Sequence, residues 1–116
     1  MKYMFLICSD EAGYEKWTEE DLGKLLEKYG AFDDEARTSG VYVEGYRLQP
    51  TPTATTVRVR KGETLTTDGP FAETKEQLGG YYILDVPDLD AAISWAAKIP
   101  SSAYGSVEVR PIWEME

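Results

Sequence analysis

Apolar residues recur along the chain at two spacings, which predict strands and helices in a definite order. Residues 2–8 are apolar at both alternating sets of positions, which is typical of a strand covered on both faces. Further strands are expected over residues 41–48, 81–86 and 107–113. Pro111 indicates that the last of these lies at a sheet edge or contains a bulge.

Two helices are expected between these strands. The first follows Thr18, a suitable N-cap before three acidic residues, and ends near Gly40. Its apolar positions recur at helical spacing and are Leu22, Leu25, Leu26, Tyr29, Phe32 and Ala36. The second helix starts at Pro87-Asp88 and runs to about Lys98. Its apolar stripe consists of Leu89, Ala92, Ile93, Ala96 and Ala97.

A β-hairpin is predicted between the two halves of the chain. Residues 55–60 and 63–67 have strand character, and Lys61-Gly62 supplies the tight turn. The element order is therefore β-α-β-hairpin-β-α-β. This order predicts one α+β domain over residues 1–116, with a ferredoxin-like βαββαβ antiparallel sheet, two helices on one face and an inserted β-hairpin.

Two helices can cover only one face of such a sheet, yet several strands are apolar on both faces. An uncovered apolar face would be an exposed patch, so something should pack on it. A second copy of the same sheet is the economical solution and predicts a homodimer. In the alternative, the inserted hairpin and the crossing over residues 49–54 cover that face.

Composition limits the classes of function. The net charge of −9, from 21 acidic and 12 basic residues, repels phosphate backbones and anionic headgroups, so neither nucleic acid nor a membrane is an expected partner. Cys8 is the single cysteine, which is consistent with a reducing compartment, and we expect a cytoplasmic protein. Histidine is absent, so no metal site is expected, and acid–base chemistry would rest on Asp, Glu, Tyr, Lys or the single Cys. No cofactor is expected.

The densest group of candidate functional residues lies in residues 67–82. Asp68 is followed by Gly-Pro, which enforces a turn. Its carboxylate could act as a catalytic general base or a ligand anchor. It could equally accept backbone hydrogen bonds in an Asx-turn.

Four more residues could bind a substrate beside it. Glu73 and Lys75 could contact a polar or anionic substrate, or form ion pairs within the surface turn. Arg110 could bind a carboxylate, or pair with Glu108 on the same face of its strand. Tyr82 could offer a hydroxyl donor, or lie in the core or an interface.

The chain resembles the YCII-related family, in its DGPF-domain branch. The resemblance is carried by Thr67-Asp68-Gly69-Pro70-Phe71 to Gly80 and by Val107-Glu108-Val109-Arg110-Pro111-Ile112. The opening Met1-Lys2-Tyr3-Met4 and the stretch Leu48 to Arg60 also match, so the resemblance covers nearly the whole chain. It implies a dimeric ferredoxin-like α/β-barrel fold.

The wider superfamily includes cofactor-free isomerases, lyases and oxygenases that act on small organic molecules in a cleft between sheet and helices. A His–Asp pair is attributed to some members of the YCII family. This chain has no histidine, so that pair cannot operate here, and Asp68 could be the surviving half.

Two hypotheses of function follow, and whether the protein is an enzyme is left open between them. The first is a cofactor-independent enzyme that performs lyase- or isomerase-like proton transfer on a small organic molecule. Asp68 would move the proton, and Arg110 or Lys75 would be its electrostatic partner. The second is a non-catalytic homodimeric module that binds a ligand or a partner. It predicts that the polar residues of 67–82 point to solvent or make only structural hydrogen bonds.

Overall fold

The structure is a computed structural model that describes residues 1–115. The strands are β1 (Lys2–Ser9), β2 (Tyr42–Arg47), β3 (Thr55–Arg60), β4 (Glu63–Asp68), β5 (Gln77–Asp85) and β6 (Ser106–Pro111). The α-helices are α1 (Glu19–Thr38) and α2 (Leu89–Lys98). Short 3-10 helices are η1 (Glu11–Lys16), η2 (Thr51–Thr53) and η3 (Pro100–Ala103). The predicted order of strands and α-helices is confirmed.

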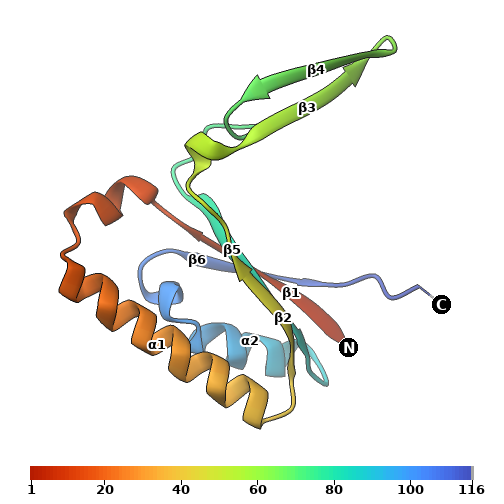
Figure 1. Cartoon of the computed structure of the whole chain (residues 1–116). Coiled ribbons are helices and arrows are strands. Elements are labelled where there is room, and N and C mark those ends of the chain that lie inside the picture. Colours follow the sequence, from red (N-terminus) through yellow and green to blue (C-terminus); the bar gives the residue numbers. More distant parts are fainter. Residues whose placement is uncertain (116) are drawn as a thin grey trace.

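Four strands form the main sheet in the order β2-β5-β1-β6, and each neighbouring pair is antiparallel. Both α-helices lie on the same side of this sheet (Figure 1). The predicted α+β class with antiparallel sheets is therefore confirmed. The β6 strand is at an edge of the sheet, as Pro111 at its end indicated.

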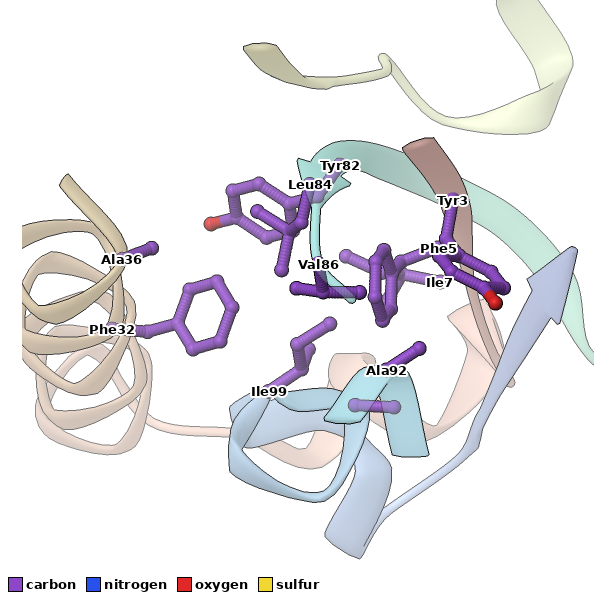
Figure 2. Packing of buried hydrophobic residues seen from close by; sticks show 11 residues of the cluster. Tyr3, Phe5, Ile7, Phe32, Ala36, Tyr82, Leu84, Val86, Ala92 and Ile99 are labelled. Carbon is purple, nitrogen blue, oxygen red and sulfur yellow. The ribbon is translucent and has the colours of Figure 1, made fainter. Parts of the chain in front are cut away.

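The core lies between the helices and one face of the sheet (Figure 2). Its sheet side is formed by alternate residues of the two central strands, Tyr3, Phe5, Ile7, Tyr82 and Leu84. Its helical side is formed by Phe32, Ala36, Ala92 and Ala96, with Ile99 after α2. Full burial of a side chain such as Phe5 or Leu84 stabilises the fold by about 1.5–3 kcal/mol.

The helix α1 begins where the sequence predicts. Thr18 Oγ1 accepts a hydrogen bond from Asp21 N at 3.1 Å, and the Asp21 carboxylate accepts one from Thr18 N at 3.1 Å, which forms a capping box. The predicted apolar face is confirmed only in the second half of the helix. Leu22 and Leu26 are exposed and lie outside the core cluster.

The hairpin β3–β4 forms a separate two-stranded sheet, as predicted. Its turn residues Lys61 and Gly62 both have positive φ, at 51° and 78°, which suits the right-handed twist of a tight hairpin. The hairpin extends away from the helices and the main sheet (Figure 1). It therefore does not cover the second face of that sheet.

The second face of the main sheet is called here the open face. It is built from residues that alternate with the core positions of the central strands, namely Met4, Leu6, Cys8, Leu78, Tyr81 and Ile83. All six side chains are partly or substantially exposed. The two helices pack on the other face, so this apolar surface has no helix over it.

Candidate functional site

A groove of about 370 Å³ lies where the crossing after β2 meets the turn before β5. It is called here the turn groove, and it is lined by Thr51, Pro52, Pro70, Ala72, Glu73, Thr74 and Gln77. The groove contains part of the run singled out in the sequence. It combines apolar proline walls with a carboxylate, hydroxyls and an amide, which is the mixture that typical small-molecule sites use.

Hydrogen bonds of Glu11 and Gln77 hold the two walls of the groove in place. The Glu11 carboxylate accepts hydrogen bonds from Thr51 N at 3.0 Å and from Thr51 Oγ1 at 2.7 Å. The Glu11 amide donates to Gln77 Oε1 at 2.9 Å, and Gln77 Nε2 donates to the carbonyl of Thr74 at 2.6 Å. Residue Glu11 therefore ties both walls together, because it bonds the crossing and the start of β5 at once.

Asp68 lies at the base of the hairpin, at the end of β4, and is exposed. The two ends of the hairpin are joined there, because Gly69 N donates to the carbonyl of Ala54 at 2.7 Å. Gly69 has a φ of 96°, a conformation that favours glycine. Within residues 1–115 the Asp68 side chain accepts no hydrogen bond, so the Asx-turn considered from the sequence does not form.

Glu73 and Lys75, the other two candidate residues of this turn, lie in different surroundings. Glu73 lines the turn groove. Lys75 is exposed in the loop that follows, and within the described chain it makes no ion pair. The expected pairing of Lys75 with a neighbouring glutamate is therefore wrong. The nearby Glu76 instead accepts a hydrogen bond from Ser106 Oγ on β6 at 2.6 Å.

Tyr82 and Arg110 lie on opposite faces of the main sheet. Tyr82 pairs with Phe5 on the core face, whereas Arg110 pairs with Met4 on the open face. The Arg110 guanidinium forms an ion pair with Glu108, which was the structural role considered for it. Within one chain the structure thus does not bring Asp68, Tyr82 and Arg110 to one cavity, and their roles in a site stay predictions.

Two tyrosines next to each other on β5 have strongly perturbed hydroxyls. Tyr82 donates to Asp33 Oδ1 at 2.6 Å, and burial together with this hydrogen bond raises its pKa far above the usual range. Tyr81 donates to Glu44 Oε2 at 2.5 Å, and this bond raises the pKa of Tyr81 to about 12. Both phenols stay protonated at neutral pH and act as hydrogen-bond donors to carboxylates.

The Tyr82 ring also fixes the residue beside it. A Cβ atom on Gly45 would lie 2.4 Å from the Tyr82 ring, so β2 can pass Tyr82 only with glycine at this position. The sequence predicted neither this contact nor the bonds of Glu11, Glu44 and Asp33. In each contact the two residues are far apart along the chain, and no local sequence pattern indicates that they meet.

Among residues 1–115, no cluster of three or more Cys, Asp or Glu side chains is arranged to hold a metal ion. None of the helices in that part of the chain is long and apolar enough to cross a membrane.

Comparisons with known proteins place the chain in a family. The model of the YCII-related domain matches residues 1–116. Over 114 residues the chain is 38% identical to "Uncharacterized protein R00369" of Rhizobium meliloti (strain 1021), and the match covers 97% of this chain and 92% of that relative. The chain therefore belongs to the YCII-related family. This membership confirms the family named from the sequence, and the DGPF branch stays a prediction.

Proposed function

We propose that the protein is a homodimeric binding module in which the open faces of two copies pack together and each turn groove takes a small polar organic molecule. The strand order β2-β5-β1-β6, with both helices on one face, supports a ferredoxin-like topology. Packing of two such sheets would form a dimeric α/β barrel. The residues Asp68-Gly69-Pro70-Phe71 support a place in the DGPF branch of the family.

The observation that carries the dimer is the apolar open face. Its centre contains Leu6, Ile83 and Tyr81, which are only partly buried in one chain. Monomeric proteins rarely leave a contiguous apolar patch of this kind in water. Beyond β6 the side chain of Trp113 is 91% exposed, so apolar surface extends past the sheet edge. A second copy would remove both surfaces from water.

Charges at the two edges of the open face suit a two-fold arrangement. One row of side chains runs across the sheet from Glu44 on β2 through Ile83 and Met4 to Arg110 on β6. In a dimer with β2 of each copy opposite β6 of the other, Glu44 faces Arg110 of the second copy. A two-fold axis makes this contact twice, which favours the pairing and fixes its register.

Substitution of the open face tests the dimer. Ile83→Asp places a charge at the centre of the proposed interface and is expected to give a monomer in sedimentation velocity. Ile93→Asp is the matched control, because Ile93 is exposed on α2 and lies outside the open face. Identical dimers from both variants would contradict the proposed interface. A circular dichroism spectrum of each variant shows whether it is folded.

The composition of the turn groove supports the ligand class. The groove offers the Glu73 carboxylate and the hydroxyls of Thr51 and Thr74 between two prolines. A carboxylate and hydroxyl oxygens can accept hydrogen bonds from hydroxyl or ammonium groups. The net charge of −9 also disfavours anionic ligands. Small polyols and amino alcohols therefore fit the groove best.

A panel of polyols and amino alcohols tests this site by NMR. Binding is expected to shift the amide signals of Thr74 and Gln77, and Glu73→Gln is expected to weaken it. The control is Glu63→Gln at the distant end of the hairpin. Absence of shifts at the groove for the whole panel, or equal binding by Glu73→Gln and wild type, would contradict the ligand proposal.

The free carboxylate of Asp68 favours a second candidate function, cofactor-independent proton transfer. The side chain is exposed at the hairpin base and makes no hydrogen bond or ion pair within residues 1–115, so it can accept a proton. Deuterium exchange next to the carbonyl of small ketones and lactones, followed by NMR, tests this function. Exchange that is equally fast with Asp68→Asn and with wild type would exclude the role.

A further inference from the structure

The β3–β4 hairpin is an arm that bonds to the following loop near its base, from Thr56 to the carbonyl of Gly69 and from Arg58 to that of Phe71. Among the described residues its strands pair with each other and with no other strand, and it stands away from the core (Figure 1). The radius of gyration is 16.2 Å, compared with about 13 Å for a compact domain of similar length. A hairpin of two strands is at best marginally stable alone in water. A regular hairpin of this length is therefore expected to pack on another surface.

The two faces of the arm have different chemistry. One face carries the uncharged residues Thr55, Val57, Val59, Thr64 and Thr66, with Asp68 at its base. The other face carries Thr56, Arg58, Arg60, Glu63, Leu65 and Thr67. Val57 and Val59 are each 59% exposed, which makes the first face the apolar one available for packing. It is called here the valine face.

The charge of the arm is opposite to that of the chain. It carries three basic residues, Arg58, Arg60 and Lys61, against two acidic ones, Glu63 and Asp68, and its tip holds Arg60, Lys61 and Glu63. The chain as a whole has 21 acidic and 12 basic residues. A basic tip and an acidic remainder are complementary between two copies of the same chain. Nucleic acid would attract the tip but would be repelled by the rest of the protein.

We propose that each hairpin docks on a second copy of the chain. The valine face packs against that copy, and the basic tip lies beside its acidic surface. The arm thus extends the interface beyond the open face and clasps the other subunit. This inference rests on the homodimer proposed above, because it assigns the hairpin to the same assembly.

Cross-linking between isotopically distinct copies tests the docking. Wild-type chains with ¹⁴N and with ¹⁵N are mixed, allowed to exchange subunits and treated with a carbodiimide, which joins a lysine amine to a carboxylate at direct contact. Cross-linked peptides that contain Lys61 in one isotope and an acidic residue in the other are expected. Lys61 cross-links within one isotope alone, in a sample shown to be dimeric, would overturn the proposal.

Substitutions on the arm distinguish a failure of the docking proposal from a failure of the homodimer proposal. The double variant V57T/V59T keeps the strand character and removes the apolar surface, and the dimer dissociation constant is expected to rise about tenfold. Leu65→Thr on the opposite face is the control and should leave the constant unchanged. A wild-type dimer that V57T/V59T does not weaken would overturn the docking alone. A monomeric wild type would overturn the homodimer and the docking with it.

Discussion

The hydroxyl of Tyr82 donates a 2.6 Å hydrogen bond to the carboxylate of Asp33 and so joins β5 to α1. Its ring packs against Phe32 in the same core, with the ring centroids 4.9 Å apart. The hydroxyl that the sequence suggested for substrate binding thus has an acceptor inside the protein already. In this structure it fastens a central strand to a helix.

Removal of this hydroxyl is expected to destabilise the fold. Tyr82→Phe leaves the partly buried Asp33 carboxylate without its donor, which costs about 1–3 kcal/mol. Urea denaturation at neutral pH measures the loss. Tyr104→Phe is the control, because Tyr104 contacts Trp17 through its ring and its hydroxyl makes no hydrogen bond in the described chain. Equal stability of both variants would show that the Tyr82–Asp33 bond contributes nothing.

The raised pKa values of Tyr81 and Tyr82 predict that the protein loses stability at alkaline pH. Their pKa values are raised above the ordinary value of 10.0 in the folded state, to about 12 for Tyr81. The unfolded chain therefore releases these protons first, and stability that is complete below pH 10 falls as the pH rises. For Tyr81 the loss occurs between pH 10 and about 12. Urea titrations across this range measure it.

The variant Tyr81→Phe tests whether Tyr81 causes the loss of stability at alkaline pH. Tyr81→Phe removes one of the groups with a raised pKa and should flatten the decline of the unfolding free energy over that pH range. Tyr104→Phe should decline as steeply as wild type. A decline in Tyr81→Phe as steep as in wild type would mean that Tyr81 does not carry the effect.

The capping box of α1 gives a further test. Thr18→Ala removes the acceptor of the Asp21 amide and is expected to cost about 1 kcal/mol. The pKa of Asp21 is lowered by hydrogen bonds from Thr18, so its carboxylate contributes stability at neutral pH that is lost as the pH falls below the ordinary value of 3.8. Thr18→Ala keeps the backbone amide of residue 18, which is the main cause of the lowered pKa, so most of this sensitivity to acid should remain. Thr18→Ser, which keeps the cap, should behave like wild type.

Much of the fold could be predicted because its signals are local. The Thr18 cap, the Lys61-Gly62 turn and the Asp88 cap before α2 are each read from a few consecutive residues. The candidate site could not be predicted in this way. Tyr82 and Asp33 are 49 positions apart, and Glu11 and Thr51 are 40 apart. Which residues meet at such distances depends on packing that no local pattern records.

The alternation of side chains along a strand also left open which face of the sheet is the core face. It separates two faces of the sheet, but it does not say which face receives the helices. The faces of β5 and β6 were therefore not matched from the sequence, and Tyr82 and Arg110 were grouped in one site although they lie on opposite sides.

The thiol of Cys8 offers a probe of the open face. Burial is the main cause that raises the pKa of this thiol. The negative charges of the nearby Glu76 and Glu108 carboxylates raise it further. In the proposed dimer a second sheet covers it as well. Wild type is expected to react slowly with a disulfide reagent, and the monomeric Ile83→Asp variant faster at the same pH. Equal rates would contradict the shielding of Cys8 by a second copy.

The mass of the protein in solution tests the account most directly. Sedimentation equilibrium of the wild-type chain is expected to give twice the 13.0 kDa of one chain. A single species of 13.0 kDa at every concentration studied would contradict the account, because the open face would then be exposed to water.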